Sequence, residues 1–96
     1  MASYIMLLNW TEQGVAKIKA SSKRLDAGRK AFKKLGCELK DAYLTMGPYD
    51  LICVLDAPDA ETAARAILSL GAQGNVRTLT LPAFTEDEYR KIINAL

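Results

Sequence analysis

The polar side chains that could do chemistry in this sequence lie on predicted strands or at strand ends. The candidates for a ligand-binding site are Asn9, Trp10, Tyr43, Tyr49, Asp50 and Arg77. Asp50 draws attention because it begins a very apolar stretch, and a partly buried carboxylate must be paired or hydrogen-bonded. Arg77 and the backbone N–H groups of the turn are its possible partners. Two roles are open for Asp50. It either stabilises the hairpin turn or a subunit contact, or it acts as a base or as an anchor for a ligand.

Neighbouring candidates need not share a site. Asn9 and Trp10 are consecutive, and successive side chains on a strand point to opposite faces. The same alternation separates Tyr49 from Asp50, so we expect one to face the helices and the other a subunit partner. Trp10 either packs in the core at the strand end or forms a pocket wall.

Several kinds of chemistry are excluded by residue type. The chain has no histidine, which removes Ser-His-Asp and Cys-His catalysis and the commonest metal ligand. Its two cysteines, Cys37 and Cys53, form no CxxC motif, and no phosphate-binding glycine motif occurs. If a hairpin turns at Gly47-Pro48, Cys53 lies opposite residue 42, which places Cys37 too far away for a disulfide. We expect no metal site and no cofactor.

The charge is unevenly distributed. The segment Lys17–Lys40, called the basic segment below, holds nine Lys or Arg against two acidic residues, although the whole chain has a formal net charge of only +2. Such a run is typical of a solvated helix face, with weak nucleic-acid binding as the alternative. No signal peptide or membrane span is recognisable, and we expect a cytoplasmic protein.

Seven elements must position these residues. Residues 3–10 predict a strand that is apolar on both faces, and Thr11 is a natural cap for a helical region that reaches residue 35, with a break near 20–24. Strands are expected at 37–46, 49–57 and 75–84. A helix follows Pro58-Asp59, and Thr85 with Glu88 forms a capping box that starts a last helix.

The order β-α-β-β-α-β-α predicts a single α+β domain over residues 1–96. Its first six elements form the ferredoxin-like arrangement, an antiparallel sheet with helices on one face, and a C-terminal helix is added. The first and third strands would be central, yet they are apolar on both faces. An uncovered face of this kind is too apolar for a monomer. We therefore predict a dimer-based homo-oligomer that buries sheet face against sheet face, with the last helix packed on its own domain or on a neighbouring subunit.

Separated blocks of the sequence resemble the GYD domain family of small bacterial proteins. The blocks are YIMLLNWTEQG, TMGPYD, DAPDAETAA and GNVRTLTLPAFTEDEYRKI, and the family signature Gly-x-Tyr-Asp falls on Gly47, Pro48, Tyr49 and Asp50. The resemblance covers essentially the whole chain. It implies the dimeric α/β-barrel class, and it supplies neither a reaction nor catalytic residues.

Three hypotheses for function remain. The first is an oligomeric, non-catalytic domain that binds a small molecule or a protein partner. The second is a cofactor-independent oxygenase or isomerase for a small aromatic compound, by analogy with monooxygenases of the dimeric α/β-barrel class. It requires a pocket lined by Tyr43 or Tyr49 together with Asp50 or Arg77. The third is nucleic-acid binding through the basic segment.

Overall fold

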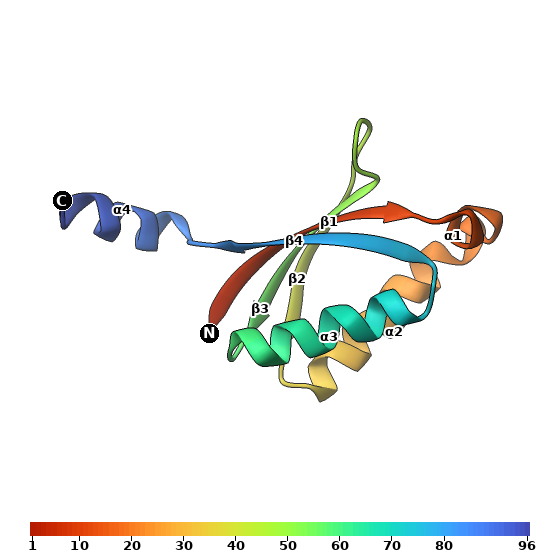
Figure 1. Ribbon diagram of the computed structural model, residues 1–96, viewed down its shortest axis with the longest axis horizontal. Helices are drawn as coiled ribbons and strands as arrows, with labels where there is room; N and C mark the ends of the chain where they lie inside the picture. Colours follow the sequence, from red (N-terminus) through yellow and green to blue (C-terminus); the bar gives the residue numbers. More distant parts are fainter.

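The predicted order of elements is confirmed in a computed structural model that describes residues 1–96 (Figure 1). The elements are β1 (Ala2–Trp10), α1 (Glu12–Ala16), a 3₁₀ turn η1 (Ile18–Ala20), α2 (Ser21–Lys34), β2 (Glu38–Leu44), β3 (Leu51–Ala57), α3 (Ala60–Ala72), β4 (Val76–Ala83) and α4 (Glu86–Asn94).

The four strands form one antiparallel sheet in the order β2-β3-β1-β4. The first and third strands therefore occupy the centre, as the ferredoxin-like arrangement requires. Ala42 is the partner of Cys53 across the β2–β3 hairpin, which is the register predicted from a turn at Gly47-Pro48. Both cysteines are free.

Local signals explain where the helices begin and end. The side chains of Thr11, Asp59 and Thr85 cap α1, α3 and α4, and Thr85 forms the predicted capping box with Glu88. Gly36 follows the end of α2 with a φ of 83°, a left-handed conformation that glycine adopts without steric cost.

The predicted break in the first helical region lies slightly earlier than residues 20–24. α1 ends at Ala16, η1 intervenes, and α2 begins at Ser21. The Arg24 side chain explains how the break is stabilised, because its guanidinium donates to the carbonyl oxygens of Lys17 (2.8 Å) and Gly14 (3.2 Å). These carbonyls lie where regular helical bonding stops.

One face of the sheet carries the core. Helices α2 and α3 cover it (Figure 1). Alternate residues of the central strands belong to the core on this face. The core consists of Tyr4, Met6, Leu8, Phe32, Cys37, Cys53, Leu55, Ala57, Ala63 and Ala66. The two buried residues of α3, Ala63 and Ala66, are both small.

The other face of the sheet is uncovered, and we call it the open face. Its centre consists of two rows of paired apolar residues: Leu79, Leu7 and Ile52 in one, and Leu81, Ile5 and Val54 in the other. Leu79 and Leu81 on β4 are among the exposed large hydrophobic residues of the chain. The prediction of central strands that are apolar on both faces is confirmed, and no part of this chain shields the second face.

The C-terminal helix α4 extends away from the rest of the domain, beyond the end of β4 (Figure 1). None of its residues is buried, and its apolar side chains Tyr89, Ile92 and Ile93 are exposed. Helix α4 therefore does not pack on its own domain, which was one of the two predicted alternatives. None of the helices has the length and apolarity needed to cross a membrane.

Candidate functional site

Asp50 makes a structural hydrogen bond between distant parts of the chain. Its Oδ2 accepts from the backbone N–H of Trp10 at 2.9 Å, and its own N–H donates to the carbonyl oxygen of Leu8 at the same distance. Its carbonyl oxygen accepts from the N–H of Thr45. Asp50 thus ties the end of β1 to the β2–β3 turn. Its partner is neither Arg77 nor an N–H of the turn, the two alternatives that the sequence left open.

Removing this carboxylate should destabilise the fold. We expect Asp50→Ala to lower the free energy of unfolding by about 1.5–3 kcal/mol, because a charge-assisted bond is lost and the N–H of Trp10 is left without its acceptor. Asp50→Asn keeps one acceptor oxygen and should lose less. Urea denaturation measures both. Equal stability of Asp50→Ala and the unchanged protein would contradict this role.

The rest of the family signature also shapes the turn. Gly47 has a φ of 148°, which disfavours other residues, and the carbonyl oxygen of Tyr49 accepts from Thr45 Oγ1 at 2.6 Å. β3 begins only at Leu51, so Tyr49 and Asp50 lie in the turn. Strand alternation does not apply to residues of a turn, so the prediction that these two side chains point to opposite faces loses its basis.

The six candidate residues are distributed over three places. Asn9 and Arg77 are cross-strand partners on the open face, and Tyr43 lies on the same face opposite Ile52. Trp10 lies on the helix side, while Tyr49 and Asp50 belong to the turn. The structure does not bring an acid, a tyrosine and an arginine around one cavity.

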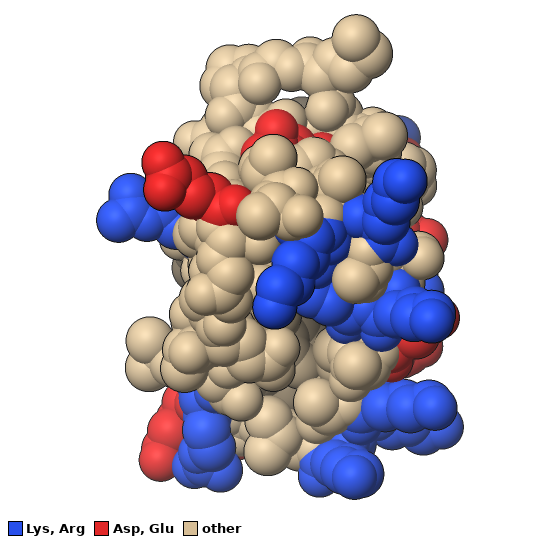
Figure 2. Space-filling model, turned by 90° about the vertical axis from the view of Figure 1, so that its right-hand side faces the viewer, with Lys and Arg blue, Asp and Glu red and all other residues tan.

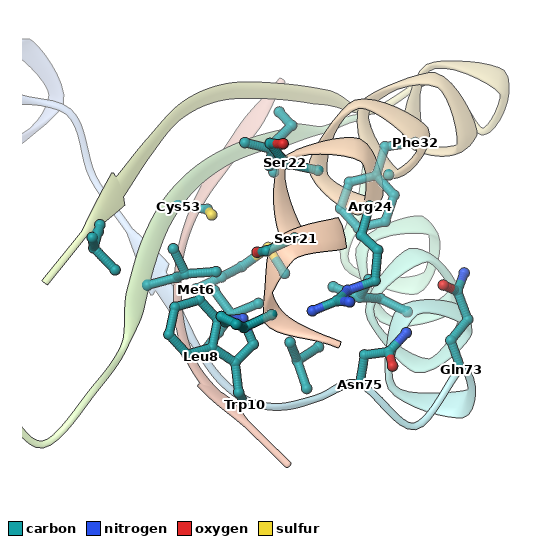
Figure 3. Close-up of a pocket in the computed structure, with 18 residues that line it drawn as sticks. Met6, Leu8, Trp10, Ser21, Ser22, Arg24, Phe32, Cys53, Gln73 and Asn75 are labelled. Carbon is teal, nitrogen blue, oxygen red and sulfur yellow. The ribbon is translucent and has the colours of Figure 1, made fainter. Parts of the chain in front are cut away.

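A cavity of about 350 Å³ lies between the sheet and α2, and sequence reasoning missed most of its residues. Of the six candidates only Trp10 lines it. The polar side chains around it are Ser21, Ser22, Arg24, Gln73 and Asn75 (Figure 3). Gly28 gives one physical cause of the space, since a Cβ on this residue would meet no atom within 4 Å. A glycine on the apolar side of a helix was the available sequence signal.

Both thiols are buried, and Cys53 lines the cavity. Burial raises the pKa of Cys53, and an Arg29 charge opposes this effect more weakly. Burial and then the Asp59 carboxylate raise the pKa of Cys37. Both side chains therefore remain thiols at neutral pH, which disfavours a role as nucleophiles.

The raised pKa values predict a loss of stability at alkaline pH. Below about pH 8.5 both thiols are protonated in the folded and the unfolded chain, so they give no pH dependence. Above it the unfolded chain loses these protons first, so the free energy of unfolding should fall as pH rises toward the folded pKa values. Denaturation at several pH values tests this prediction. A double variant, Cys37→Ala with Cys53→Ala, should show a shallower decline, and an identical decline would contradict the assignment.

The fold and its surfaces define the class of protein: a ferredoxin-like α+β domain with one apolar sheet face uncovered. Within this class the chain belongs to the GYD domain family, whose pattern matches residues 4–93. The resemblance carried by the Gly-x-Tyr-Asp signature is thereby confirmed.

One characterised relative comes from Thermus thermophilus. It is 33% identical over 84 residues, which cover 86% of this chain and 88% of the relative. It is named glutamine synthetase and cystathionine beta-lyase binding protein.

Two solved structures share the fold. The crystal structure of MtbAldR superposes with a TM-score of 0.70 at 17% identity, covering 88% of this chain and 54% of the other. The feast or famine regulatory protein from M. tuberculosis complexed with L-methionine gives a TM-score of 0.68 at 13% identity, covering 88% and 51%. This chain thus spans about half the length of these two proteins, and at such identities the likeness concerns the fold alone.

Proposed function

We propose that the protein is a non-catalytic binding domain that associates with itself and with other proteins. The observation that carries the proposal is the open face, whose paired rows of leucine, isoleucine and valine have no cover within the chain. A contiguous apolar surface of this kind marks an interaction site.

A second copy of the chain is the first partner that this surface fits. Two copies of the open face are identical, so they can pack against each other about a two-fold axis. The apolar side of α4, with Tyr89 and Ile93, lies outside its own domain and is available to the neighbouring subunit. The dimer-based assembly expected from the sequence thus accounts for both uncovered surfaces.

Protein partners are supported by the relative from Thermus thermophilus, whose name states that it binds two enzymes. The enzymatic alternative lacks a comparable observation. It requires a cavity lined by tyrosine with Asp50 or Arg77, and none of Tyr43, Tyr49, Asp50 and Arg77 lines the cavity under α2.

Two measurements test the proposal. Light scattering after size-exclusion chromatography should give a mass of at least two chains, and a mass of 10.5 kDa at micromolar concentration would contradict self-association. The immobilised protein should also retain purified glutamine synthetase or cystathionine beta-lyase of the organism that encodes it. Retention of neither enzyme would contradict binding to this class of partner.

A further inference from the structure

The cavity beneath α2 has no part in the self-association proposed above, because it lies on the opposite side of the sheet from the open face. Met6, Leu8 and Cys53 of the central strands line it from one side, and Leu25 and Phe32 of α2 from the other. Its volume of about 350 Å³ is within the range of small-molecule sites. It also exceeds the roughly 150 Å³ that suffices for benzene in an engineered apolar cavity.

The polar groups of the cavity offer hydrogen-bond donors close to one another. Arg24 uses Nη1 and Nη2 on two backbone carbonyls, and its guanidinium has five N–H groups, so donors remain. The amide oxygen of Asn75 accepts from Gln13 Nε2 at 2.9 Å, while its amide nitrogen donates to no protein group. Both residues lie against Gly14, and Figure 3 shows their side chains near each other beside the cavity.

The one charged side chain that lines the cavity is positive. Arg24 is the only charged side chain that lines it, and no Asp or Glu does. At the start of α2, where Ser21 and Ser22 line the same cavity, no side chain caps the helix and the first turn contains no acidic residue. Figure 2 shows Lys and Arg side chains gathered beside a hollow that carries no charged atoms. An acidic group is therefore the complementary one.

From these observations we propose that the cavity binds a small apolar molecule that carries one carboxylate. The apolar part packs between Met6, Leu8 and Phe32, and the carboxylate lies at Arg24 and Asn75. A guanidinium and an amide nitrogen both donate to carboxylate oxygens, and bonds to a charged group are the stronger kind. This inference does not rest on the proposed function, since it concerns the other side of the sheet.

The probe is octanoate, and the readout is the fluorescence of Trp10. Trp10 is the single tryptophan of the chain and lines the cavity, so its emission reports occupancy. We expect a saturable change on addition of octanoate, about tenfold weaker binding of 1-octanol, which lacks the carboxylate, and no change with acetate, which lacks the apolar chain. No saturable change with millimolar octanoate would overturn the proposal. Equal affinity for octanoate and 1-octanol would overturn the assignment of the carboxylate.

Two pairs of variants locate the site. Gly28→Leu places a side chain in the cavity and should weaken octanoate binding at least about tenfold, whereas Gly71→Leu, on α3 outside the cavity, should leave it unchanged. Arg24→Gln should weaken octanoate much more than 1-octanol, and Asn75→Ala should do so to a smaller degree. Unaltered octanoate binding by a folded Gly28→Leu variant would place the molecule elsewhere and overturn the inference.

Discussion

Gly14→Ala should strongly destabilise this protein. A Cβ on Gly14 would lie 2.1 Å from the carbonyl oxygen of Asn75 and 3.1 Å from its carbonyl carbon. Both atoms belong to the backbone, so no side chain can rotate away. The same carbonyl oxygen accepts from the N–H of Thr11 at 3.1 Å, and this bond would be strained as well. We expect the free energy of unfolding to fall by about 2–4 kcal/mol.

The matched control is the same substitution in a different helix. A Cβ on Gly71 would meet no atom within 4 Å, so Gly71→Ala should raise stability by about 0.5–1 kcal/mol through helix propensity alone. Urea denaturation of both variants gives the comparison. If Gly14→Ala proved as stable as Gly71→Ala, the close approach of α1 to the loop before β4 would be refuted.

Leu79→Lys is expected to convert the self-associated protein that we propose to single chains. Leu79 is 48% exposed on the open face, next to Leu7 of β1. A lysine there can keep its ammonium in water in the isolated chain, so the fold should tolerate it. In a sheet-to-sheet interface the same charge would be buried without a partner, which is strongly unfavourable. Light scattering should show the mass falling to 10.5 kDa, with the circular dichroism spectrum unchanged.

Leu68→Lys controls for the effect of an added charge. Leu68 is 73% exposed on α3, on the helix side of the domain. Its replacement should leave the mass unchanged if the open face is the interface. Dissociation by Leu68→Lys, or persistence of the assembly in Leu79→Lys, would place the interface on another surface.

The fold was predictable because its signals are local. Thr11, Asp59 and Thr85 act on the N–H groups three residues further along, so a short stretch of sequence is enough to recognise each cap. The hairpin register followed from the turn and placed Ala42 opposite Cys53. The open face was predictable for the same reason. A strand that is apolar on both faces can be recognised from its own sequence, because the alternation of side chains is visible within a single strand.

The candidate site was less predictable because its contacts are long-range. Trp10 and Asp50 are 40 positions apart, and no residue pattern in either segment predicts the hydrogen bond between the Trp10 N–H and the Asp50 carboxylate. Arg24 and Asn75 meet through Gly14, a residue that the sequence does not distinguish from other helical glycines. The strand boundary also mattered, since beginning β3 at Leu51 rather than Tyr49 removed the basis for alternation within the signature.

The N-terminus of the C-terminal helix α4 is stabilised by residues of its own segment, and this affects how the helix can associate with a partner. Thr85 and Glu88 bond each other's backbone N–H groups, and Arg90 binds Glu86 through two N–H groups at 2.8 and 3.0 Å. Helix formation in α4 is therefore supported from within, although so short a segment is marginal alone. A partner that docks on α4 meets a segment whose helical form is already favoured, so less conformational entropy is lost on binding than for a segment without such bonds.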